Sequence, residues 1–172
     1  MKTKNQRIAA FIGVVGITAT ACSSVSSLYK GDPDERWADY KSWTKITEGR
    51  TGTGDPTGFI GNVHQGRDGY RDVYVNDIGK ATITGTAPYV FPAGSVVVKE
   101  QFASKADWEA QKKPGVTVSI KIADGEGSAD NWIWADSYTG KAGASNFCAG
   151  CHGIAAQSDY VFTTEDFLKT QE

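Results

Sequence analysis

The stretch VTVSIKIAD, residues 116–124, decides which class of fold to expect. Four apolar side chains take every second position and share one face: Val116, Val118, Ile120 and Ile122. Because successive side chains of a strand point to opposite faces of a sheet, this period of two predicts a strand with one buried face. Three other stretches predict further strands: YRDVYVN (70–76), GSVVVKE (94–100) and NWIWADS (131–137).

Helices are expected on both sides of these strands. Asp32 as a cap and Pro33 at the first helical position predict an amphipathic helix over residues 34–46, DERWADYKSWTKI. The glycine-rich residues that follow, 47–62, predict a loop. The chain is therefore expected to form an α+β domain, mainly an antiparallel β-sheet with flanking helices.

The segments between and after the later strands are less regular. Residues 104–113, SKADWEAQKK, fit a short helix or a polar excursion. Residues 158–163, SDYVFT, predict an extended run, and a terminal helix is expected to begin near Thr163 or Thr164.

The clearest chemical motif is NFCAGCHGI, residues 146–154. Cys148 and Cys151 are separated by two small residues, and His152 follows directly. In a Cys-x-x-Cys-His motif, two thioethers hold the vinyl edge of a haem, and the histidine lies under the iron as its proximal ligand. We therefore expect one haem c near the C-terminal end of the domain, with His152 on the iron.

Two other uses of the motif fit the sequence less well. A structural zinc site needs four thiolate or imidazole ligands, and only Cys22 and His64 remain outside the motif. A thioredoxin-like dithiol would follow a strand in a βαβ unit, whereas the preceding residues 139–146, TGKAGASN, predict a loop.

The N-terminus is typical of an export signal. Three cationic residues precede an apolar run, residues 8–18, that is too short to span a bilayer. Ala19-Thr20-Ala21 before Cys22 suits signal peptidase or a bacterial lipobox, although the lipobox usually has a larger aliphatic residue at position 19. We favour the lipobox, because lipidation gives the odd third cysteine, Cys22, a function.

The predicted export signal and lipidation site divide the chain into three parts. Residues 1–21 are the signal peptide, residues 22–31 a lipid-anchored tether, and residues 32–172 a single domain in the periplasm, attached to the membrane through the lipid. Removing the three cations of the signal lowers the formal charge from −2 to about −5. No basic patch is left that would indicate nucleic acid as a partner.

An ordered set of segments resembles the cytochrome P-460 superfamily and its relative cytochrome c′-beta. The set runs from about Arg36 to Phe167 and comprises RWADYKSW, HQGRDGYRDVYVN, FPAGSVVVKE, DNWIWA, CAGCH and SDYVFT. The resemblance implies an antiparallel β-domain that forms a homodimer, with one c-type haem whose iron is open on its distal side. It also implies an activity on small nitrogen compounds, either the oxidation of hydroxylamine or the binding of nitric oxide.

The resemblance assigns roles to two further residues. Lys99 matches a lysine that is covalently joined to the porphyrin in cytochrome P-460, and Arg71 matches an arginine that faces the distal pocket. Both would be catalytic, and Lys99 would also bind the cofactor. A cross-link needs an amine that is partly desolvated and neutral some of the time. The alternatives are that Lys99 pairs with a carboxylate at the strand end and that Arg71 lies on the surface.

One departure from the family concerns the distal carboxylate of its enzymes. The corresponding strand offers Thr117 or Ser119 instead. Hydroxylamine oxidation releases protons, for which a positioned carboxylate is the natural acceptor. Glu100 and Asp136 are the candidates to replace it.

The side of the iron opposite His152 is expected to be open. Met1, the only methionine, leaves with the signal peptide, so His/Met ligation is impossible. His64 is the only other histidine, and a structural role is favoured for it over iron ligation. Aromatic side chains are expected to line the pocket, with these candidates: Phe59, Phe91, Phe102, Trp132 and Trp134.

Two classes of function follow. The first is an oxidoreductase that oxidises hydroxylamine and passes electrons to an external redox partner. The second is a protein that captures nitric oxide without turnover. Simple electron transfer is disfavoured, because the iron lacks a strong sixth ligand.

Overall fold

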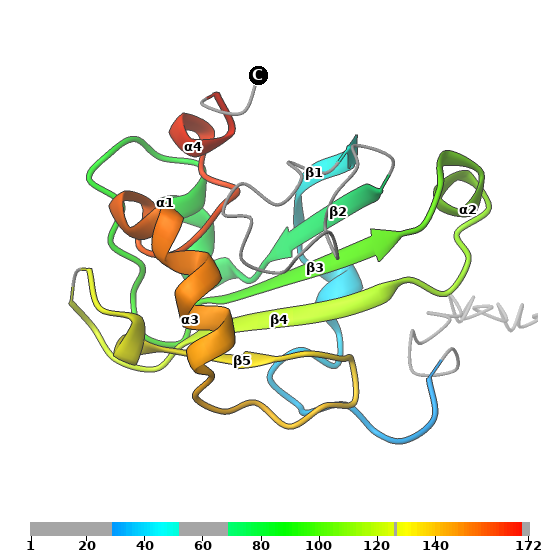
Figure 1. Cartoon of the computed structure of the whole chain (residues 1–172), viewed down its shortest axis with the longest axis horizontal. Helices are drawn as coiled ribbons and strands as arrows, with labels where there is room; N and C mark the ends of the chain where they lie inside the picture. The colour runs from blue at the N-terminus through cyan, green and yellow to red at the C-terminus, as the bar shows by residue number, and fades with distance from the viewer. Residues whose placement is uncertain (1–28, 52–68, 126, 170–172) are drawn as a thin grey trace, which may run out of the picture.

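The computed structural model describes residues 29–51, 69–125 and 127–169. Its centre is one five-stranded antiparallel sheet in the order β1-β2-β3-β4-β5, so each strand pairs with its neighbour in sequence (Figure 1). The strands are β1 (Thr44–Thr51), β2 (Tyr70–Val75), β3 (Val96–Phe102), β4 (Gly115–Lys121) and β5 (Trp132–Ala135).

Short helices connect and flank the strands. The α-helices are α1 (Asp77–Ile83), α2 (Lys105–Glu109), α3 (Asn146–His152) and α4 (Glu165–Lys169), and the 3-10 helices are η2 (Tyr40–Ser42), η3 (Ala129–Asn131) and η4 (Gly153–Ser158). The helix α3, drawn in orange, lies across one face of the sheet (Figure 1). The expected α+β class with a mainly antiparallel sheet is confirmed.

The sheet separates two apolar clusters. On one face, Val98, Val118 and Ile120 pack with Trp37 and Tyr138. On the face that α3 covers, residues of β2, β3 and β5 pack with α1 and with the chain after α3, in a cluster of Val73, Val75, Ile83, Phe91, Val97, Trp132, Trp134 and Val161. The alternation of strand side chains therefore places one set of residues in a closed core and the other set toward α3.

The four strands expected from the sequence are present as β2 to β5. In β4, Val116, Val118 and Ile120 are buried as predicted. Ile122 is not, because the strand ends at Lys121 and the Ile122 side chain is 49% exposed. Residues 104–113 contain the short helix α2, whose N-cap Ser104 accepts a hydrogen bond from the Asp107 amide.

The helix predicted over residues 34–46 is wrong. This segment forms turns, the single 3-10 turn η2, and the start of β1. Trp37 and Tyr40 are completely buried, and the Trp37 indole nitrogen donates to the Tyr138 carbonyl at 2.7 Å. These tertiary contacts replace the helical hydrogen bonds that the Asp-Pro start favoured.

Strand β1 lies where the end of that helix and the glycine-rich loop were expected. Its pairing with β2 is irregular at two places, between Lys45 and Thr47 and between Thr47 and Arg50. Gly49 lies in this irregular part with φ of +56°, and a Cβ there would be 2.7 Å from the Trp108 ring. A bulged edge strand does not keep a regular period of two, which explains why the pattern missed it.

The extended run expected at residues 158–163 is also wrong. Helix η4 occupies its start, and Asp159 and Tyr160 then take left-handed conformations, with φ of 49° and 65°. The terminal helix α4 follows at Glu165, close to the expected start.

Several sequence predictions fall on residues outside the described ranges. They are the signal peptide, the lipidation at Cys22, the role of His64 and the lining role of Phe59. Within the described ranges, no helix has the length and apolar character needed to cross a bilayer.

Candidate functional site

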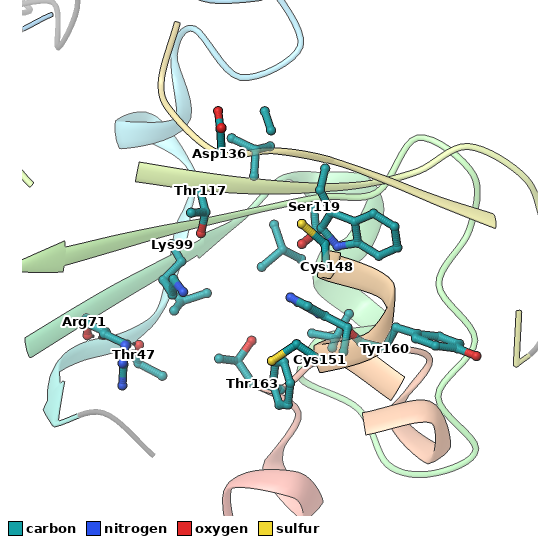
Figure 2. A pocket seen from close by; sticks show the side chains of 18 of the residues that line it. Thr47, Arg71, Lys99, Thr117, Ser119, Asp136, Cys148, Cys151, Tyr160 and Thr163 are labelled. Atoms are coloured by element: carbon teal, nitrogen blue, oxygen red, sulfur yellow. Dashed lines mark hydrogen bonds between the residues drawn. The ribbon is translucent and has the colours of Figure 1, made fainter. Parts of the chain in front are cut away.

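A cavity lies between the sheet and α3, and it brings together most of the residues singled out in the sequence (Figure 2). Its lining includes Cys148, Cys151 and His152 from α3, Arg71, Lys99, Thr117 and Ser119 from the sheet, and Tyr160, Phe162 and Thr163 from the chain after η4. Residues from β2, β3, β4 and α3, distant in sequence, therefore face one space.

The helix α3 presents both thiols to this cavity. Ser145 caps the helix by accepting a hydrogen bond from the Cys148 amide at 3.2 Å. Cys148 and Cys151 lie three positions apart and therefore share a helix face. Both line the cavity, and neither is part of a disulfide.

His152 at the end of α3 is held in one orientation. Its Nδ1 lies 2.7 Å from the Tyr160 carbonyl oxygen, which can only accept, so Nδ1 carries the proton and Nε2 keeps its lone pair. The ring packs between Trp134 and Phe162, with centroids 5.8 and 4.7 Å away. Burial lowers the pKa of His152 to about 4, with a smaller contribution from the charge of Lys99, although the hydrogen bond to Tyr160 opposes the shift. The imidazole is therefore neutral and able to bind a metal at neutral pH.

These groups fit a haem c. Two cysteine thiols and a neutral imidazole on one short helix are the groups that covalent haem attachment needs. Two further lining atoms, Trp134 Nε1 and Thr163 Oγ1, are buried without a hydrogen-bond partner among the described residues. The same part of the chain has no group of three His, Cys, Asp or Glu side chains that could hold a bare metal ion.

Two cationic side chains enter the cavity from the sheet. Lys99 on β3 and Arg71 on β2 are both partly buried lining residues, and Figure 2 shows them on the sheet side. Burial, followed by the charge of Arg71, lowers the pKa of Lys99 to about 8, and burial also lowers the pKa of Arg71. Among the described residues neither has a carboxylate partner. The alternative of a surface Arg71 does not fit this placement.

The two carboxylates proposed as replacements for a distal acid are placed differently. Glu100 is completely buried on the opposite face, where it accepts hydrogen bonds from Tyr40 at 2.6 Å, Lys41 at 2.5 Å and Tyr74 at 3.3 Å. It therefore cannot serve the cavity, because neighbouring residues of a strand point to opposite sides. Asp136 lines the cavity and is exposed to solvent.

Thr117 and Ser119 both line the cavity, and these are the residues that the resemblance put in place of the distal carboxylate. Thr117 is paired with Lys99 across the β3–β4 ladder. Strand β4 therefore places the neutral hydroxyl of Thr117 beside the partly buried amine of Lys99. A carboxylate at this position would form an ion pair with the amine.

Among the aromatic candidates in the described part of the chain, Trp134 lines the cavity. Phe91 and Trp132 pack edge to face in the core behind the cavity, at 5.7 Å between centroids, and Phe102 is buried elsewhere. The sequence reasoning missed Phe162 and Tyr160. Their position within ten residues of the Cys-x-x-Cys-His motif was the available signal, because a chain that leaves a short helix stays close to it.

The family model for cytochrome P-460 matches residues 37–163, which include all five strands and α3. Among curated proteins, none matches the chain significantly. The matched range contains the cavity-lining cysteines, histidine, lysine and arginine in the positions described above. The chain therefore belongs to the cytochrome P-460 family, which implies a haem cofactor.

Proposed function

We propose that this protein is an exported mono-haem c-type cytochrome that oxidises a small nitrogen compound, hydroxylamine, at an open iron position. One observation carries the proposal. The cavity contains a neutral His152 with a free Nε2 and, on the sheet side, the cations Lys99 and Arg71 without a carboxylate partner among the described residues. Such a site has one iron ligand and a mainly apolar space with two cationic side chains that can contact a small ligand.

The residues of the cavity lining that were singled out in the sequence have distinct roles in this proposal. Cys148 and Cys151 would hold the haem covalently, and His152 would bind its iron through Nε2. A haem bound there supplies the iron at which the nitrogen compound binds and gives up electrons. Arg71, whose charge is fixed, orients a polar or anionic nitrogen ligand. The electrons pass to an external redox partner.

Lys99 can serve either as a base or as the site of a cross-link to the porphyrin; the cross-link would replace an N–H and a porphyrin C–H bond by a C–N bond, with a peroxide as the two-electron oxidant. With a pKa of about 8, about a tenth of its amine is neutral at pH 7, compared with less than a thousandth for an ordinary lysine. A neutral amine is both a proton acceptor and a nucleophile. The oxidation releases protons, and Lys99 and the exposed carboxylate of Asp136 are acceptors within the described lining.

A second function, the capture of nitric oxide without turnover, is favoured by a different observation. Thr117 and Ser119 line the cavity where a catalytic carboxylate would be expected, and Glu100 is on the other face. Without a carboxylate at this position, a gas ligand can bind while proton-coupled oxidation is slow.

Hydroxylamine-dependent reduction of an artificial one-electron acceptor by the purified holoprotein separates the two functions. An oxidase reduces the acceptor with multiple turnovers, and Arg71→Leu lowers this rate at least tenfold. Arg36→Leu is the control, because Arg36 pairs with Asp34 at the surface and does not line the cavity. Nitric oxide binding without any hydroxylamine turnover would support the second function and contradict the first.

Location and assembly are also proposed from the sequence and the resemblance. Export by residues 1–21, a lipid on Cys22 and residence in the periplasm are consistent with covalent haem attachment, which takes place outside the cytoplasm. A homodimer is expected from the resemblance.

A further inference from the structure

A buried ion pair lies next to the cavity and takes no part in the functions described so far. Lys121, the last residue of β4, and Asp159, just after η4, have side chains that are 0% and 1% exposed. The lysine nitrogen lies 2.8 and 2.7 Å from the two carboxylate oxygens of Asp159.

Both members of the pair are fully hydrogen-bonded. Asp159 also accepts from the Phe91 amide at 2.9 Å and from the Trp132 indole nitrogen at 3.4 Å. Lys121 also donates to the Gly125 carbonyl at 2.9 Å, and its ammonium group lies 5.2 Å from the centroid of the Trp132 ring. A buried ion pair is often no more stabilising than apolar residues of the same size, so its presence suggests a role in fixing one conformation.

Asp159 begins the turn that carries the hydrogen-bond partner of His152. Asp159 and Tyr160 both have left-handed backbones, with φ of 49° and 65°. This conformation costs free energy in residues other than glycine, most of all in a bulky residue such as Tyr160, and persists only where surrounding contacts hold it. The Tyr160 carbonyl, placed by this turn, accepts the 2.7 Å hydrogen bond from His152 Nδ1.

We propose that the Lys121–Asp159 ion pair is a positioning device for His152. It ties the turn at residues 159–160 to the end of β4, so that the Tyr160 carbonyl holds the imidazole at a fixed angle and with a fixed hydrogen-bond strength. The same strand carries Thr117 and Ser119 into the cavity. One strand thereby helps to position both His152 and the hydroxyl-bearing residues of the same cavity. The inference rests on the proposed haem attachment through Cys148 and Cys151.

The strength of that hydrogen bond is expected to affect the bond between iron and histidine. Donation from Nδ1 to a carbonyl makes the imidazole a more basic ligand. If the carbonyl moves away, the imidazole becomes a weaker donor and the iron–histidine bond is weakened. The iron–histidine stretching frequency of the reduced holoprotein, measured by resonance Raman spectroscopy, reports this change independently of activity.

The test uses the double variant Lys121→Met/Asp159→Asn, which removes both charges and leaves no unpaired buried ion. Asparagine is also tolerated in the left-handed region. The iron–histidine frequency is expected to shift to a lower value. The conservative variant Lys121→Arg retains the charge and is expected to stay close to the wild-type frequency.

The chain offers a closely matched control on the opposite face of the sheet. Asp72 is also buried, pairs with Lys45 at 3.2 Å, and accepts from the Gly49 amide at 2.7 Å and the Trp108 indole at 3.0 Å. Its variant Lys45→Met/Asp72→Asn removes a similar network that has no contact with the turn at residues 159–160, and it should leave the frequency unchanged.

A wild-type frequency in Lys121→Met/Asp159→Asn would overturn the inference and leave the pair a purely structural one. An equal shift in both double variants would overturn it as well, because the effect would then be general. The proposed function fails in a different way, namely if the wild-type protein carries no covalent haem at all.

Discussion

The hydrogen bond between His152 and Tyr160 can be tested with small ligands that replace the side chain. In His152→Gly, the haem is expected to stay attached through Cys148 and Cys151, and the missing side chain leaves a space for an imidazole. 4-Methylimidazole reproduces the histidine ring and keeps the N–H group that faces Tyr160. 1-Methylimidazole binds iron through its other nitrogen and has no N–H group to donate.

The size of the difference follows from the geometry. The Nδ1 to oxygen distance of 2.7 Å is at the short end for such a bond, and the Tyr160 residue is partly buried. Losing this bond and leaving the carbonyl without a donor costs about 1–2 kcal/mol, which is about 5- to 30-fold in the dissociation constant. 4-Methylimidazole should therefore bind His152→Gly more tightly than 1-methylimidazole by that factor.

The assay is an optical titration of the haem in the variant, with the wild-type protein titrated in parallel to identify binding at the open side of the iron. The expected factor applies to the additional binding seen only in the variant. Equal affinities for the two ligands, or tighter binding of 1-methylimidazole, would show that the Tyr160 carbonyl does not engage the iron ligand.

Four further substitutions test other parts of the site and its location. A cross-linked haem should have a ferrous Soret band shifted far to the red, and Lys99→Arg should abolish this shift and release the haem from peptides that contain position 99; an unchanged spectrum means that there is no cross-link. Cys22→Ser should move the protein from the membrane fraction to the soluble fraction, and continued anchoring would contradict lipidation. His64→Ala should leave the iron high-spin, whereas a change from low-spin to high-spin would identify His64 as an iron ligand. Glu100→Ala should lower the free energy of unfolding in urea by about 2–4 kcal/mol. The reason is that the substitution leaves the Tyr40 hydroxyl and the Lys41 ammonium, whose side chain is 30% exposed, without their carboxylate partner. A loss below 1 kcal/mol would contradict the buried network.

The strands of the sheet could be predicted because residues 70–76 and 116–122 alternate, and because residues 94–100 are a continuous β-branched run. In β3 and β4 the even positions are buried in one core, while Lys99, Thr117 and Ser119 face the cavity. The same alternation also puts Glu100 and Lys99 on opposite faces of β3, so the sequence pattern already argued against Glu100 as a distal acid, and the prediction did not use it. The helix α1 also had a local signal, since Asn76 caps it by accepting from the Gly79 amide; the sequence reasoning did not use it.

The parts that could not be predicted depend on contacts between distant residues. The segment around Trp37 resembles a capped helix locally, but the burial of Trp37 and Tyr40 under the sheet determines its conformation. Likewise, the left-handed turn at Asp159 and Tyr160 depends on Lys121, which is 38 residues away in sequence. Only the fold reveals that this turn supplies the hydrogen-bond acceptor for His152.

The decisive measurement is to denature and digest protein purified from a host that has the cytochrome c maturation machinery, and to find where the haem remains. We expect a coloured protein whose haem stays on the peptide that contains Cys148, Cys151 and His152, and whose reduced spectrum changes when nitric oxide is added. A colourless protein, or a haem that acid and organic solvent extract completely, would contradict covalent attachment at α3 and with it the proposed function.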